Sequence, residues 1–220
     1  MTDFARARTT MVDTQLRTSS VTDRRILGAM GQVPREIFVP DEWRDLAYLD
    51  DELPLDAGDT SRKMPAPAPF ARLVQLAQIA ETDEVLVLAC GTGYSAAVIA
   101  ALAKTVVALE PDPDLANRAR ENLATVGLTA IPVRSGPIDA GAPKDGPYDV
   151  IVVESVMPEV PRTLLGQLKD GGRLVALVGQ GMTAVAHVFV RSGKDVAGRA
   201  DFNARLPAVA HAPERDAFVF

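Results

Sequence analysis

Cysteine is almost absent from this chain of 220 residues, and histidine is nearly as scarce. The single cysteine, Cys90, excludes an internal disulfide and any cysteine-rich metal site. The two histidines, His187 and His211, are far apart in sequence. We therefore expect no structural metal, and any chemistry must come from other side chains or from a cofactor.

Long apolar runs and an excess of positive charge are also missing. No apolar run approaches the roughly 20 residues that a membrane-spanning helix needs, and the N-terminal MTDFARARTT lacks the apolar core of a signal peptide. The formal net charge of -6 argues against non-specific affinity for nucleic acid. We expect a cytoplasmic protein whose partner is neither a membrane nor a nucleic acid.

The most informative stretch lies at 84–110 and reads EVLVLACGTGYSAAVIAALAKTVVALE. It begins with a continuous apolar run, typical of a strand buried on both faces of a parallel sheet. Gly91 and Gly93 follow, then a small apolar helix and a second apolar run that ends in Glu110. Because ligands bind beyond the carboxyl ends of parallel strands, this order places the glycines and Glu110 at a ligand site.

The residue types in this stretch suit a nucleoside without a pyrophosphate. Glycine lets the backbone approach a ligand closely, and an acid that closes the next strand can accept both hydroxyls of a ribose. The pattern stops at G-x-G, because Ala96 stands where a third glycine would be, and the Lys-Ser/Thr pair of a phosphate-binding loop is missing. S-adenosylmethionine is the obvious candidate ligand. The alternative is an ordinary strand–helix–strand unit with a glycine turn.

Strand and helix patterns alternate through most of the chain, which predicts an α/β Rossmann-like domain with a mostly parallel, doubly wound sheet. The expected strands are 85–88, 105–109, 130–133, 148–153 and 173–178, followed by antiparallel edge strands from Met182 onward, at 183–191 and 216–220. The expected helices are 3–18, 23–30 with Thr22 as N-cap, a turn at 41–46, 70–80, 94–103, 112–126 and 158–169. We expect one domain, with a helical collar at 1–50, an irregular substrate-side loop at 51–69 and the Rossmann-like core at 70–220.

Two stretches beside the nucleotide segment point to one family. Residues 11–40 read MVDTQLRTSSVTDRRILGAMGQVPREIFVP, and residues 147–179 read PYDVIVVESVMPEVPRTLLGQLKDGGRLVALVG. Together with 84–110 they resemble the protein-L-isoaspartate O-methyltransferase family, whose N-terminal pattern carries Q-L-R, D-x-R-x-L-x-A-M and V-P-R-E-x-F-V-P. The resemblance covers roughly residues 11–190.

The resemblance implies a repair reaction, in which a methyl group passes from S-adenosylmethionine to the side-chain carboxylate of an isoaspartyl residue in damaged protein or peptide. A carboxylate is ionised at neutral pH, so the reaction needs positioning rather than a general base. The resemblance implies these site residues: Ala89, Cys90, Gly91, Gly93, Glu110, Pro137 and Ile138 for the cofactor, and Thr60 and Ser61 beside the reacting carboxylate.

The chain departs from the family at three places. Val87 stands where the family carries a buried Glu in the first strand, and Pro137 stands where it carries an Asp expected to hold the adenine amino group. The substrate loop, G-x-T-I-S-x-P in the family, keeps Thr60, has Ser61 one place out of register, and is longer before Pro67. These departures leave a second hypothesis open, a family member with another methyl acceptor or with a binding or regulatory role.

Three further side chains allow two interpretations each. Cys90 in the glycine turn is either a small filler or a reactive thiol. Arg62 and Lys63 in the substrate loop are either solvated or, if the loop closes over the site, able to pair with a carboxylate of the substrate.

Overall fold

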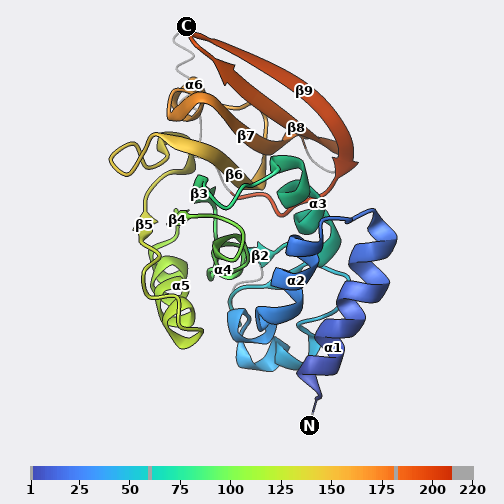
Figure 1. The fold of residues 1–220 in the computed structure, drawn as a ribbon. Helices are drawn as coiled ribbons and strands as arrows, with labels where there is room; N and C mark the ends of the chain where they lie inside the picture. The colour runs from blue at the N-terminus through green and yellow to red at the C-terminus, as the bar shows by residue number, and fades with distance from the viewer. Residues whose placement is uncertain (1, 59–60, 181–182, 210–220) are drawn as a thin grey trace, which may run out of the picture.

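The computed structural model describes residues 2–58, 61–180 and 183–209. Its centre is a seven-stranded sheet in the order β5-β4-β3-β6-β7-β8-β9. The strands are β3 Glu84–Leu88, β4 Thr105–Glu110, β5 Val133–Ser135, β6 Tyr148–Met157, β7 Leu168–Gln180, β8 Thr183–Ser192 and β9 Asp195–Ala204. The neighbouring strands β5, β4, β3, β6 and β7 pair in parallel. Strands β8 and β9 extend the sheet at one edge by antiparallel pairing. The predicted fold class is confirmed (Figure 1).

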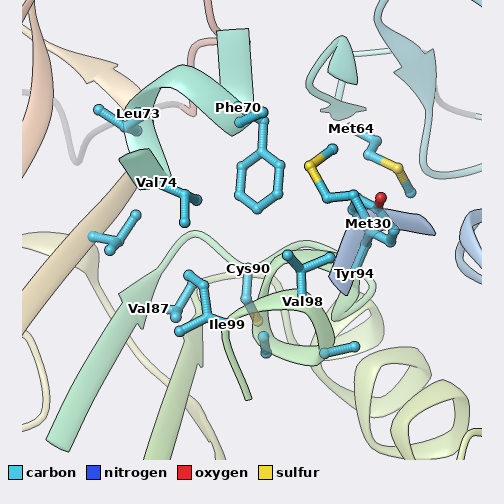
Figure 2. Close-up of a cluster of buried hydrophobic side chains, with 14 of the residues drawn as sticks. Met30, Met64, Phe70, Leu73, Val74, Val87, Cys90, Tyr94, Val98 and Ile99 are labelled. Atoms are coloured by element: carbon cyan, nitrogen blue, oxygen red, sulfur yellow. The ribbon is translucent and has the colours of Figure 1, made fainter. Parts of the chain in front are cut away.

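Both faces of the parallel strands are buried, as their continuous apolar runs predict. In β3, Val85 and Val87 belong to one hydrophobic cluster, and Leu86 and Leu88 belong to another. The first cluster is the larger one and joins the sheet to α3, α4 and the N-terminal helices. Figure 2 shows part of it, where Met30, Met64 and Phe70 surround Tyr94. The collar and the sheet thus share one core.

The helices cover the two sheet faces and the N-terminal region. They are α1 Phe4–Met11, α2 Arg24–Gln32, α3 Pro67–Ala77, α4 Tyr94–Ala100, α5 Pro113–Thr125 and the single turn α6 Arg162–Leu165. Three predicted boundaries were wrong at the N-terminal end. The helix expected over 3–18 changes at Val12 to a wider and then a tighter turn. Asp23, not Thr22, caps α2 by accepting a hydrogen bond from the Arg25 N–H. Helix α3 starts three residues early, because Pro67 at its first turn needs no N–H partner.

The helix expected over 158–169 is the largest error in the parallel region. Strand β6 continues to Met157, and β7 begins at Leu168, which pairs with Tyr148. Only one helical turn, α6, lies between these strands. The apolar residues within 158–169 that suggested a longer helix are therefore divided between α6 and the sheet.

Other strand predictions also need correction. Strand β5 lies at Val133–Ser135 rather than 130–133. Antiparallel pairing from residue 183 onward is confirmed, but the strand after β8 is β9, which the sequence did not predict. The strand expected at 216–220 lies outside the described residues, as does Met182. The loop 51–69, expected to be irregular, contains a small hairpin of β1 Leu53–Pro54 and β2 Lys63–Met64.

The N-terminal collar reaches the ligand edge of the sheet. Its turn Arg35–Phe38 ends beside the glycine turn, where the Thr92 hydroxyl donates to the Phe38 carbonyl. Tyr48 is buried and donates to Glu36, as expected for collar packing. Within the described ranges, no helix is long and apolar enough to span a bilayer.

Candidate active site

The glycine turn after β3 has the backbone that its residues predict. Ala89, Gly91 and Gly93 all have positive φ angles, +62°, +55° and +99°. A β-carbon at Gly91 would lie 2.7 Å from Leu55 Cδ1, and one at Gly93 would lie 3.2 Å from Leu123 Cγ. Positive φ favours glycine at both positions, and a side chain would also meet Leu55 of the β1–β2 hairpin at Gly91 and Leu123 of α5 at Gly93.

Glu110 ends β4 beside this turn and is completely buried. Its Oε2 accepts a hydrogen bond from the Gly91 N–H at 2.8 Å, and its Oε1 accepts one from the Asp112 N–H at 3.1 Å. The carboxylate therefore ties the glycine turn to the end of the neighbouring strand. The structure brings together the glycines and the acid that the sequence selected.

Arg62 completes the environment of Glu110. Its Nη1 lies 2.6 Å from Oε1 and its Nη2 lies 2.9 Å from Oε2, a bidentate pair across 48 residues of sequence. The side chain of Arg62 is 15% exposed, so this pair is largely withdrawn from water. Of the two interpretations of Arg62, the described structure shows a paired side chain in the closed loop. Its partner is a carboxylate of the protein itself.

The β1–β2 hairpin is held over the site by α5 as well. Arg118 of α5 donates to the Leu55 carbonyl at 3.1 Å and pairs with Asp56 at 2.5 Å. The Leu55 N–H in turn donates to the Arg62 carbonyl at 3.0 Å. Leu55 and Arg62 therefore cover Gly91 and Glu110 from one short element.

A cavity of about 540 Å³ lies next to Glu110 at the end of β5. Pro137 lines it together with Leu109, Gly136 and Ala142. Ile138, the other residue assigned to this region, is buried in the second hydrophobic cluster and is not among the lining residues. Arg134, Ser135, Lys144 and Asp145 line the cavity as well, so both apolar and polar groups face it, as a ligand site for a purine ring would need.

Comparison with known proteins decides the family. The family model described as "Protein-L-isoaspartate(D-aspartate) O-methyltransferase (PCMT)" matches residues 6–207. This chain belongs to the protein-L-isoaspartate(D-aspartate) O-methyltransferase family.

Individual relatives agree with this assignment. The "Protein-L-isoaspartate O-methyltransferase" of Methanoculleus marisnigri is 44% identical over 174 residues, which cover 79% of this chain and 78% of the relative. The "Protein-L-isoaspartate O-methyltransferase 1" of Syntrophobacter fumaroxidans is 38% identical, covering 89% of both chains. A solved structure of a protein-L-isoaspartate O-methyltransferase superposes with a TM-score of 0.80 at 26% identity, covering 92% of this chain and 66% of that one.

The two residues assigned to the methyltransferase's acceptor lie in the hairpin loop. Thr60 falls outside the described residues. Ser61 is exposed and lines an outer groove of about 260 Å³, together with Lys63, Arg205 and Pro207. Successive residues of an extended segment point to opposite sides, so Ser61 and Lys63 face the groove while Arg62 faces Glu110. The role of Ser61 beside the reacting carboxylate of the substrate stays a prediction.

Cys90 behaves as a small filler in the turn of this family member. It is buried, and burial raises the pKa of its thiol well above the ordinary value, with the charges of Glu110 and Glu154 acting in the same direction. The thiolate is the reactive form of cysteine, and it is disfavoured here. Across the described residues, no group of three or more His, Cys, Asp or Glu side chains could hold a metal ion.

A second group of buried polar side chains lies near the methyltransferase site and was not predicted from the sequence: Arg35, Tyr94, Ser95 and Glu154. A signal was present in the sequence, because Glu154 interrupts the apolar run of a strand buried on both faces. Charged residues are almost never fully buried without a partner, so an acid at that position was visible as an exception.

Proposed function

We propose that this chain transfers a methyl group from S-adenosylmethionine to the side-chain carboxylate of L-isoaspartyl residues in damaged proteins. The observation that carries the proposal is the buried Glu110 carboxylate, which closes β4 against a G-x-G turn in a member of this family. An acid in that place accepts the two hydroxyls of a ribose. No pyrophosphate-binding pattern accompanies it.

The surrounding residues fit the parts of this cofactor in order along the sheet. The cavity beside Pro137 at the end of β5 accommodates the adenine, and Glu110 at the end of β4 receives the ribose. Gly91, at the end of β3, leaves room above the backbone for the methionine portion once the Leu55 side chain moves. Strand β6 is the next strand in the sheet, so its carboxyl end lies on the acceptor side.

The reaction needs no general acid or general base from the protein. S-adenosylmethionine supplies a methyl group activated by a sulfonium. The isoaspartyl carboxylate is ionised at neutral pH, so one of its oxygens forms the new C–O bond while the methyl–sulfur bond breaks and the electron pair remains on sulfur. No proton is transferred. The protein's residues bind both molecules, orient them in line and exclude water from the developing bond.

Arg62 and the ribose compete for the same carboxylate. Both oxygens of Glu110 already accept two N–H groups each, and Arg62 supplies one to each oxygen. Ribose hydroxyls can reach Glu110 only when the Arg62 side chain moves away from it. This movement would also carry the β1–β2 hairpin away from Gly91. The apparent affinity for the cofactor is therefore reduced by the fraction of molecules in which the pair is formed.

We accordingly expect Arg62→Ala to bind S-adenosylhomocysteine more tightly than the wild type, by at least about fivefold. Isothermal titration calorimetry measures this directly. Arg199→Ala is the matched control, because it removes an arginine whose partner, Asp201, lies with it on the edge strand β9. Unchanged or weaker binding by Arg62→Ala would show that Arg62 does not compete with the cofactor.

The function itself is tested with a pair of peptides of one sequence, containing either L-isoaspartate or normal L-aspartate at the same position. We expect labelled methyl from S-adenosylmethionine to enter the isoaspartyl peptide only, as an ester that alkali hydrolyses to methanol. Cofactor binding without transfer to either peptide would instead favour a family member with a different acceptor or a binding role.

A further inference from the structure

Four buried polar atoms at the carboxyl ends of β3 and β6 have no partner in good hydrogen-bond geometry in the described structure: Arg35 Nη1, Tyr94 Oη, Ser95 Oγ and Glu154 Oε2. They lie close enough to act on one another in pairs, Tyr94 on Arg35 and Ser95 on Glu154. The four residues are between 0% and 6% exposed. A buried polar group without a well-formed hydrogen bond lowers stability, so four together need an explanation. Such groups are often retained where a ligand supplies the missing partner.

The four residues come from three parts of the chain and converge. Arg35 lies in the collar, with its Cζ 4.8 Å from the centre of the Tyr94 ring. Its other donors are used, since Nε donates to the Ala47 carbonyl at 2.8 Å and Nη2 donates to the Pro65 carbonyl at 2.6 Å. Tyr94 and Ser95 open α4, directly after the glycine turn. Pro65 follows the hairpin, so Arg35 lies beneath the substrate-side loop.

Glu154 faces this group from the sheet. The pairing of β6 is irregular between Val152 and Val156, but Ser95 and Arg35 both act on the Glu154 carboxyl, which places it beside them. Val152 belongs to the cluster that contains Tyr94. Burial raises the pKa of Glu154 to about 8, and the nearby Ser95 hydroxyl and then the Glu110 charge act on it in opposite senses. At neutral pH Glu154 is therefore mostly protonated, and its carboxyl group can donate a hydrogen bond.

With Glu154 protonated, all four groups are donors or can act as donors, and their net charge is that of Arg35 alone. Such a set of groups complements a carboxylate. Two carboxylates could occupy it, that of the acceptor and that of the cofactor's methionine. The position favours the acceptor. The ribose is placed at the end of β4 and the methionine portion at the end of β3, and Glu154 lies on β6, the next strand beyond them.

We propose that Arg35, Tyr94, Ser95 and Glu154 form the binding site for the acceptor carboxylate. This proposal rests on the methyltransferase function and assigns its acceptor side to residues other than Thr60 and Ser61. The two oxygens of a carboxylate have about four lone pairs, so up to three of these donors can bind it while one lone pair remains to attack the methyl carbon. Ionisation of Glu154 places a second negative charge against the acceptor and removes one donor.

The charge state of Glu154 therefore controls acceptor binding. The titratable and charged groups that face it are Arg35 of the collar, Arg62 of the hairpin, Cys90 and Tyr94 of the glycine turn and α4, and Glu110 of β4. The pKa of Cys90 is raised by burial, and so is that of Tyr94, which keeps both groups neutral in the range where Glu154 titrates. Burial lowers the pKa of the Arg35 guanidinium, but an arginine side chain is not deprotonated in a protein at the pH of this titration.

The test is the pH dependence of kcat/KM for an isoaspartyl peptide, followed by release of S-adenosylhomocysteine so that the lifetime of the ester does not matter. We expect the wild type to lose at least about fivefold in kcat/KM between pH 7 and 9 through a rising KM for the peptide. Glu154→Gln keeps the shape and an N–H donor, and should flatten this alkaline limb. Glu159→Gln is the matched control, since Glu159 is exposed on the loop after β6; it should keep the wild-type profile.

Tyr94→Phe provides an independent check, because it removes one donor and keeps the ring. It should raise the KM for the peptide and leave the Kd for S-adenosylhomocysteine unchanged. A wild-type alkaline limb that persists in Glu154→Gln would overturn the proposal. Two outcomes would assign the site to the cofactor's carboxylate and overturn the acceptor assignment. One is a higher Kd for S-adenosylhomocysteine in Tyr94→Phe, and the other is a Kd that depends on pH only while Glu154 is present. If the wild type transfers no methyl at all, the proposed function itself fails.

Discussion

Replacing Glu110 by alanine is expected to weaken S-adenosylhomocysteine binding roughly 10- to 150-fold, which corresponds to about 1.5–3 kcal/mol for hydrogen bonds to a charged group. The comparison is cleanest in the Arg62→Ala background, because Arg62 no longer competes for the carboxylate there. Removing Glu110 then removes only the acceptor for the ribose and for the Gly91 and Asp112 N–H groups. Calorimetric titration of both variants gives the difference.

Glu121→Ala serves as the control for this substitution, since Glu121 is exposed on α5. Its affinity should equal that of the parent. Equal affinity of the Glu110 variant and its parent would place the ribose elsewhere. Thermal unfolding should be recorded alongside, because the glycine turn loses its tie to β4 when Glu110 is removed.

The second large effect concerns Gly93→Val. Gly93 has a φ of +99°, and a β-carbon would lie 3.2 Å from Leu123 Cγ and 3.4 Å from the Ala119 backbone of α5. A β-branched residue there combines backbone strain with overpacking against a helix. We expect the free energy of unfolding to fall by about 2–5 kcal/mol, measured by urea denaturation.

Gly127→Val separates the effect of backbone strain from the effect of overpacking against a helix. Gly127 also has a positive φ, +80°, but a β-carbon there meets nothing within 4 Å. It should lose only the strain contribution, about 1–2 kcal/mol. Equal losses at both positions would show that the contact between the glycine turn and α5 contributes nothing to stability.

Much of the sheet could be predicted because its signals are local. The run EVLVL, the glycine turn and the strand ending in Glu110 each show within a few residues. Strands β3 and β4 lie where the sequence places them, and α4 starts as predicted at Tyr94 but ends at Ala100, three residues before its predicted end. Strand β9 could not be predicted in this way. Most of its side chains are exposed, so it shows no apolar alternation, and its partner is the neighbouring strand β8 rather than the core.

The parts of the candidate site that depend on short motifs could be selected from the sequence, and the parts that depend on tertiary contacts could not. Gly91 and Glu110 could be selected from the strand–turn–strand pattern. The pair of Arg62 with Glu110 joins residues 48 apart and depends on how a hairpin folds back over the sheet. Arg35 lies in a motif of the family, but its unpaired nitrogen becomes visible only when the collar, α4 and β6 are packed together.

The central claim is that the Glu110 carboxylate binds the ribose hydroxyls of the cofactor. The most direct measurement is a double-mutant cycle that crosses Arg62→Ala and Arg62→Ala/Glu110→Ala with S-adenosylhomocysteine and its 2′-deoxy analogue, titrated calorimetrically. We predict that deleting the hydroxyl weakens binding at least about tenfold when Glu110 is present and less than about twofold when it is absent. An equal loss with and without Glu110 would contradict the account.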